Sequence, residues 1–303
     1  MKKFLFTVIF YILFLFDAFA QSEEANEITE QSETAGITIS AEYQLSSLAF
    51  STKGINSGSI LTWRDIYLNG AYVNVNFPGA PFSYQRTNIG VGFSGSFNGY
   101  WTDDDANNKL DIIYTAAAET YLLELNYEIF SVDYGINYEL SHKLGLDFTT
   151  LFFKNYDATP YMNMDSDIYG SIEGLTNTFD HYILGFYGGV QVVYGTGVFY
   201  MALSGQAGIG ISLSFADWIH RPDLKHPVSF SYFGLSFRGE SNFEIGFRLK
   251  GGITLFSKAF LMYGISPGLG LITSYGSNDD IGIGSKFMEL SRASLNVGIK
   301  ISF

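Results

Sequence analysis

Apolar and polar residues alternate along many stretches of this chain. The last twelve residues, RASLNVGIKISF, carry an apolar side chain at every second position from Ala293 to Phe303. Successive side chains of a strand point to opposite faces, so this alternation predicts a strand with one apolar and one polar face. Comparable stretches predict about ten strands in all, with starts near Ile37, Ala71, Ile89, Val132, Leu144, Leu184, Ile209, Phe243 and Leu261.

The segments between these strands are of two kinds. Short turns are expected at residues 78–81, 141–143, 194–197 and 257–259, and longer polar segments near 51–60, 102–115, 157–177, 216–227 and 275–288. Short turns at one end and long loops at the other are typical of bacterial outer-membrane barrels. The pattern therefore predicts an all-β, transmembrane antiparallel β-barrel of about ten strands over residues 37–303, as one domain.

The first twenty residues have the pattern of a secretory signal. Lys2 and Lys3 precede an apolar run, and Ala18-Phe19-Ala20 forms a small-x-small cleavage site. Residues 21–36 contain five glutamates and no basic residue, which predicts an acidic disordered leader. The expected location is the cell outer membrane after removal of residues 1–20. The edge of a soluble β-sandwich is the alternative for the last strand, but the signal and 33 glycines favour a barrel.

Composition narrows the possible partners. The formal net charge is −13, which disfavours nucleic acid and favours cationic partners. The chain has no cysteine, so disulfides and a lipid-anchoring cysteine are both excluded. In a barrel, the outward apolar face contacts outer-membrane lipid, and a closing strand that ends in Phe303 is typical of substrates of the barrel-assembly machinery.

Three short motifs stand at predicted outer ends of strands. They are Ser59-Ile-Leu-Thr-Trp-Arg64, the segment GYWTDDDANN at 99–108, and Phe215-Ala-Asp-Trp-Ile-His220. Their order and spacing, together with the closing strand, resemble the omptins, a family of ten-stranded outer-membrane endopeptidases. The matching family patterns are S-x-L-x-W-[KR], D-x-D and D-x-H.

This resemblance implies a set of site residues. Asp103 and Asp105 would form an aspartate pair, and Asp217 with His220 would form an aspartate–histidine pair across a groove. A water between the pairs would attack the peptide carbonyl. A carboxylate orients the imidazole that takes a proton from water, and close carboxylates share a proton. The family cleaves beside basic residues, so basic peptides or proteins are the implied substrates; no cofactor and no metal is implied.

Two features depart from the family pattern. Strict alternation from Ile89 onward would direct Asp103 and Asp105 outward, so a bulge near Gly95 or Gly99 is expected. Two residues separate Asp217 from His220, where omptins have one, and a separation of three places side chains on opposite strand faces. Asp223 and His226 have the same spacing and form an alternative catalytic pair.

Three functions stay open at this point. The first is an omptin-like endopeptidase that acts at basic residues. The second is a catalytically inactive barrel that binds proteins at the cell surface as an adhesin. The third is a small channel. Fold alone does not choose between them, but a histidine that converges on Asp103 would favour the enzyme, and a lumen filled with side chains would disfavour the channel.

Overall fold

The structure is a computed structural model that describes Gly36–Phe303 except residues 55–58, 79–84, 106–110, 136–137, 161–169, 196, 221–223 and 274–280. The expected signal peptide and nearly all of the acidic leader lie outside the described residues. The strands are β1 (Thr38–Gly54), β2 (Ser59–Pro78), β3 (Gln85–Ser96), β4 (Tyr100–Asp105), β5 (Asp111–Tyr134), β6 (Tyr138–Pro160), β7 (Ile172–Tyr194), β8 (Phe199–Trp218), β9 (Phe230–Arg248), β10 (Ile253–Thr273) and β11 (Ile281–Ser302).

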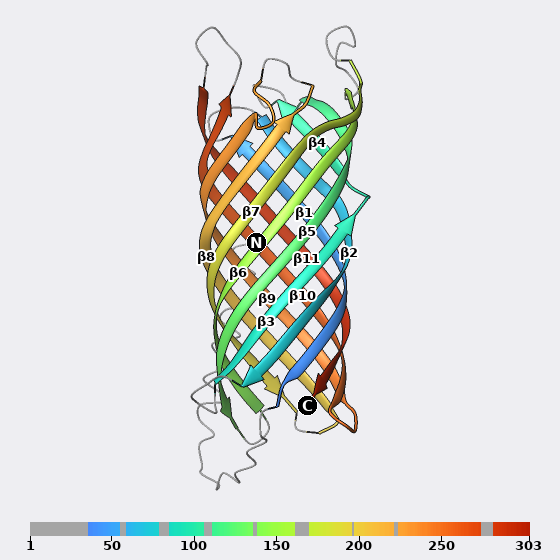
Figure 1. Ribbon diagram of the computed structural model, residues 1–303, viewed down its shortest axis with the longest axis vertical. Coiled ribbons are helices and arrows are strands. Elements are labelled where there is room, and N and C mark those ends of the chain that lie inside the picture. The colour runs from blue at the N-terminus through green and yellow to red at the C-terminus, as the bar shows by residue number, and fades with distance from the viewer. Residues whose placement is uncertain are drawn as a thin grey trace. The chain divides into compact units, whose positions relative to one another are not determined.

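All of these strands belong to one antiparallel sheet that closes on itself. β1 pairs with β11 on one side and with β2 on the other, which completes the ring (Figure 1). β3 and β4 both lie between β2 and β5, so they fill a single position in the ring. The eleven strand segments therefore form a ten-stranded barrel, and the predicted fold class is confirmed.

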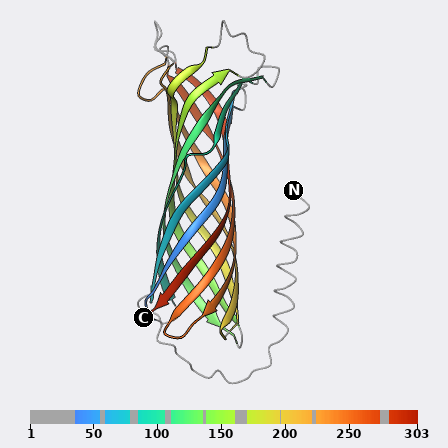
Figure 2. The ribbon, with the colours of Figure 1, turned by 90° about the vertical axis from the view of Figure 1, so that its right-hand side faces the viewer.

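The register of the pairs fixes the tilt of the strands. A circuit of the ring along paired residues that leaves β1 at Glu42 returns to β1 at Gly54, twelve residues further along. Such a stagger in a ten-stranded ring corresponds to a tilt of about 40°. Figure 2 shows this tilt from the side, with β1 in blue next to β11 in red.

The outer face of the barrel is apolar. The inner face is polar over the half of the barrel that contains the short turns. Along β1, Ile39, Tyr43 and Leu45 are exposed, whereas Glu42 and Gln44 between them are buried. This arrangement is the reverse of a soluble protein and is the one a barrel needs in lipid. In the described part of the chain, no helix is long and apolar enough to cross a membrane.

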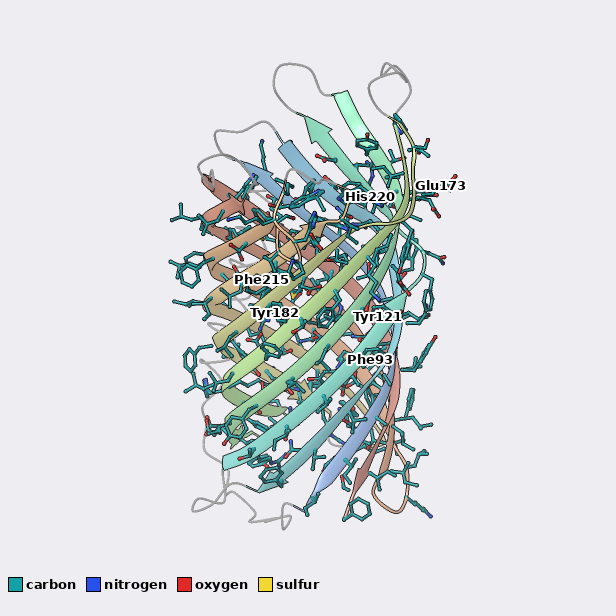
Figure 3. The ribbon with its side chains drawn as sticks, turned by 45° about the horizontal axis from the view of Figure 1, so that its top comes forward. Phe93, Tyr121, Glu173, Tyr182, Phe215 and His220 are labelled. Atoms are coloured by element: carbon teal, nitrogen blue, oxygen red, sulfur yellow. The ribbon has the colours of Figure 1, made fainter. Side chains whose placement is uncertain are left out.

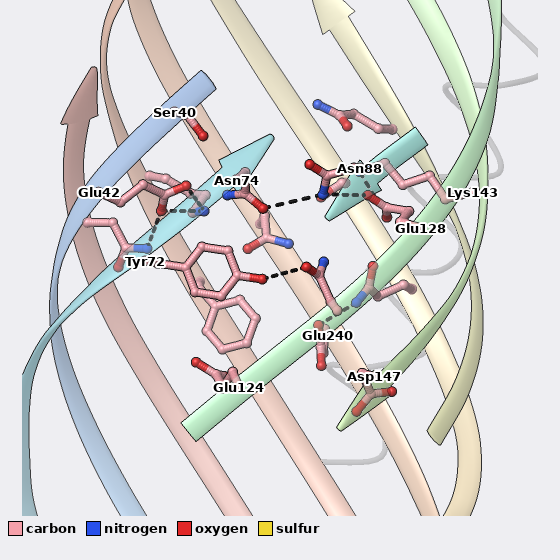
Figure 4. A pocket seen from close by; sticks show the side chains of 18 of the residues that line it. Ser40, Glu42, Tyr72, Asn74, Asn88, Glu124, Glu128, Lys143, Asp147 and Glu240 are labelled. Atoms are coloured by element: carbon pink, nitrogen blue, oxygen red, sulfur yellow. Dashed lines mark hydrogen bonds and ion pairs between the residues drawn. The ribbon is translucent and has the colours of Figure 1, made fainter. Parts of the chain in front are cut away.

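The lumen has two levels. Towards the outer end it is filled by an interior cluster whose aromatic members are Phe50, Trp63, Trp101, Phe153, Phe179, Phe230 and Tyr232. Below this cluster lies a cavity of about 320 Å³ lined by charged and amide side chains (Figure 4). Ion pairs cross this lower level, among them Arg292 to Glu124 and Arg238 to Asp147, each at 2.6 Å.

Two predicted turns were wrong. Residues 141–143 lie inside β6 and residues 257–259 lie inside β10; the chain reverses instead between Tyr134 and Tyr138 and between Arg248 and Ile253. The polar residues that suggested turns face the lumen. Lys143 pairs with Glu128 at 3.5 Å and Lys258 pairs with Glu42 at 2.6 Å. A lumen ion pair and a turn both place polar residues within an apolar run, so the local sequence did not distinguish them.

Candidate functional site

The break between β3 and β4 turns Asp103 towards the lumen. Before the break Phe93 faces out and is 58 % exposed; after it Tyr100 faces out at 59 % and Trp101 faces in at 2 %. Residues 97–99 therefore reverse the alternation, as expected from the sequence. Asp103 follows Trp101 by two residues and shares its face, so its side chain is directed into the mouth of the barrel.

Side chains from both neighbouring strands surround Asp103. Its register partners are Leu61 on β2, which belongs to the interior cluster, and Tyr114 on β5, which packs against that cluster. Burial disfavours the charged form of Lys286 of β11, and the nearby carboxylate of Asp103 partly offsets this. The side chain of Asp105 lies outside the described side chains, so the predicted Asp103–Asp105 pair stays a prediction.

Asp217 forms a short hydrogen bond with a histidine at the outer end of β8. The Nδ1 atom of His226 donates to Oδ1 of Asp217 at 2.5 Å, and the Asp217 side chain is 17 % exposed. The connection from β8 to β9 folds back to bring the two together: Trp218 N donates to Ser229 Oγ at 3.0 Å, and Ser229 N donates to Ala216 O at 2.9 Å.

The two histidines of this connection have different partners. His220 Nε2 donates to the carbonyl oxygen of Leu175 at 3.1 Å, near the outer end of β7 (Figure 3). Asp223 lies outside the described residues. The described contact thus joins Asp217, from the first predicted pair, to His226, from the second. Spacing along the chain did not reveal this contact, because it depends on how the β8–β9 connection returns.

The acidic groups stand on opposite walls of the ring. β5, β6 and β7 separate β4, which carries Asp103, from β8, which carries Asp217. Ala216 belongs to the interior cluster and Trp218 packs against it, so both side chains point into the barrel. The side chain of Asp217, between them on β8, therefore points away from the lumen. Asp217 and His226 therefore form a rim pair, whereas Asp103 faces the lumen.

The interior cluster forms the floor below Asp103. His181 of β7 lies within this floor, is fully buried, and makes a 2.7 Å hydrogen bond through Nδ1 with Ser214 Oγ. Its ring centroid lies 5.0 Å from that of Phe50. His181 is therefore a packed interior residue. Among the described residues, no group of three His, Asp or Glu side chains is placed to hold a metal ion.

A closed ring of tilted antiparallel strands with an apolar outer face is the architecture of a bacterial outer-membrane β-barrel, and this chain has that fold. It is similar to the outer membrane protease OmpT from Escherichia coli, with a TM-score of 0.66 and 14 % sequence identity over 92 % of this chain and 99 % of that chain. The translocator domain of the autotransporter NalP from Neisseria meningitidis matches with a TM-score of 0.43 and 11 % identity over 90 % of each chain. No protein-family model and no curated protein sequence matches this chain.

At this identity the similarity to OmpT concerns the fold. The chain has an outer-membrane barrel fold similar to that of OmpT, with an apolar face turned outward to lipid. The roles of the candidate residues rest on the geometry described above.

Proposed function

We propose that this protein is an outer-membrane endopeptidase whose site lies at the outer rim of the barrel. The observation that carries the proposal is the 2.5 Å hydrogen bond between His226 Nδ1 and Asp217 Oδ1. A carboxylate in this position holds the imidazole in one tautomer and stabilises its cation, which prepares Nε2 to take a proton from water.

The remaining parts of the mechanism come from the opposite wall. Asp103 would orient the attacking water together with Asp105. Because Asp103 faces the lumen and Asp217 stands on the opposite wall, the ring of His226 would have to extend over the rim for its Nε2 to take the proton as the water attacks the peptide carbonyl. Because Asp217 leaves β8 on the outer side, the substrate would lie across the rim rather than enter the lumen. The net charge of −13 favours peptides with basic residues.

The proposal is tested by peptide cleavage. Protein refolded in lipid vesicles is given fluorogenic peptides with paired basic residues, alongside peptides in which those residues are acidic. We expect cleavage of the basic peptides, and a loss of about 100-fold or more in kcat/KM for His226→Ala and for Asp103→Asn.

His220→Ala is the matched control, since it removes a histidine of the same connection that hydrogen-bonds to a backbone carbonyl. We expect this variant to stay within about threefold of the wild type. Full activity of His226→Ala, or no cleavage by the wild type in any lipid, would contradict the proposed function.

The outward direction of Asp217 favours a second candidate, a barrel that binds basic proteins at the cell surface without cleaving them. In that case the basic peptides bind to the folded protein and are recovered intact. Asp217→Asn weakens the binding, and the effect decreases with salt, because a rim carboxylate acts through screened electrostatics.

The interior cluster makes a channel the least supported function. Ring centroids in the cluster lie close together, 4.9 Å for Trp63 and Phe153 and 5.5 Å for Phe50 and Phe179. We expect the protein to show no steady ion conductance in a planar bilayer. A double variant, Trp63→Ala with Phe179→Ala, has a wider lumen and should conduct intermittently. Steady conductance of the wild type would contradict this expectation.

Phe303 supports the expected contact with the barrel-assembly machinery. Its ring is exposed after the end of β11, and its backbone N–H donates to the carbonyl oxygen of Ile37 at 2.9 Å. We propose that this exposed aromatic end is the part of the chain that the machinery binds.

A further inference from the structure

A lysine faces the same mouth as Asp103. Lys286 of β11 is two residues from Met288 and four from Leu290, and both of those side chains are buried in the interior cluster. Alternation along the strand therefore directs Lys286 into the lumen, at the outer edge of the cluster. No motif in the sequence singled out this residue.

Glycines on the neighbouring strands leave room for the lysine. Its register partners are Gly54 on β1 and Gly268 on β10, so no side chain flanks it on either strand. A Cβ atom built at Gly270 would lie 2.8 Å from Cγ of Lys286, and also 2.8 Å from Cε2 of Phe230. The apolar stem of Lys286 is thus packed between Gly270 and an aromatic ring, which limits where its ammonium group can go.

Asp103 is the described acidic group that attracts Lys286. Residues paired across neighbouring strands lead from Asp103 on β4 to Leu61 on β2, then to Thr52 on β1 and to Met288 on β11. Lys286 lies two residues before Met288 on β11. The described ionisable side chains that face this place from the packed strands include Tyr114 of β5, Tyr232 of β9 and His181 of β7, and His181 is linked through Ser214 to Met288. The two phenols are neutral at ordinary pH. His181 is fully buried, where a charge is costly, so Lys286 supplies the positive charge.

We propose that Lys286 is a positioning residue that holds Asp103 ionised and directed into the mouth of the barrel. Two unassisted carboxylates at close range share a proton. The positive charge of a nearby lysine favours the ionised form of Asp103. Asp103 then accepts a hydrogen bond from water without sharing a proton with the second carboxylate. The catalytic part of the proposal rests on the proposed function. The structural part rests on the placement of Lys286 and Asp103 in the same mouth of the barrel.

The ion pair is tested without reference to activity. Urea unfolding in lipid vesicles is measured for Lys286→Met, Asp103→Asn and the double variant. We expect the midpoint shift of the double variant to be smaller than the sum of the single shifts at pH 7, because each single variant already removes the attraction between the two charges. Additive shifts at pH 7 would overturn the proposal.

The catalytic meaning is tested by the pH dependence of kcat/KM. In the proposed mechanism the acid limb of the wild type reports the base His226. We expect Lys286→Met to steepen this limb by adding a second ionisation, because Asp103 loses its cationic neighbour and its pKa rises by about 1–3 units. Lys286→Arg keeps the charge and should keep the wild-type profile. Lys53→Met is the matched control, since Lys53 is an exposed lysine directly before Gly54 on β1.

The two tests separate the possible failures. Coupled unfolding with no cleavage by the wild type overturns the proposed function and leaves the ion pair standing. Cleavage by the wild type with an acid limb that Lys286→Met does not steepen overturns the role of Lys286 and leaves the proposed function standing.

Discussion

Trp63→Ala should reduce the free energy of unfolding by about 3–5 kcal/mol, the usual cost of a large-to-small change in a packed core. Trp63 is fully buried in the interior cluster, and its ring centroid lies 4.9 Å from those of both Phe153 and Phe179. Its indole Nε1 also donates to Oδ1 of the buried Asn155 at 3.1 Å. The substitution therefore opens a cavity and leaves a buried amide without its donor.

The measurement is urea unfolding of the barrel in lipid vesicles, followed by the change in electrophoretic mobility of the unheated protein. Trp63→Phe keeps much of the ring and loses the hydrogen bond, so its cost should be about 1–3 kcal/mol. Tyr100→Ala removes an exposed ring from the outer face of β4 and should cost less than about 1 kcal/mol. Equal effects of Trp63→Ala and Tyr100→Ala would show that the interior cluster is not closely packed.

Arg292→Met should destabilise the barrel by about 3–5 kcal/mol, because it leaves a carboxylate in the lumen without its partner. The Arg292 guanidinium donates to Glu124 through Nη1 at 2.6 Å and to Ser46 Oγ through Nε at 3.3 Å. It also lies 5.3 Å from the ring centroid of Phe260. Arg292 thus connects β11, β5, β1 and β10 across the lumen.

The double variant Arg292→Met with Glu124→Gln distinguishes the ion pair from simple packing. We expect it to recover a large part of the lost free energy, since no uncompensated charge remains. Lys143→Met is the control: Lys143 is 3.5 Å from Glu128 and is more exposed than Arg292, so its cost should be clearly smaller. A double variant no more stable than Arg292→Met alone would contradict this account.

The barrel itself was predictable because its signal is local and repeated. The alternation in the last twelve residues and in the comparable stretches indicates strands with one lipid-facing side, and this holds whichever strands they pair with. The reversal of alternation before Asp103 was also predictable. Strict alternation from Ile89 would direct Asp103 outward, so the inward-facing Asp103 that the family resemblance implies requires a break near Gly99. The turns at 141–143 and 257–259 were not, since lumen-facing Lys143 and Lys258 have the same local appearance as turn residues.

The sequence by itself determined the ten-stranded barrel, its acidic character and the positions of the candidate carboxylates along the strands. The tertiary structure decided which groups meet. Asp217 meets His226 because the β8–β9 connection folds back, and Lys286 and Asp103 share the mouth of the barrel because β1 and β2 lie between β11 and β4. Alternation sets the face of a side chain from its immediate neighbours, whereas a contact across the ring depends on the register of every strand between its two partners.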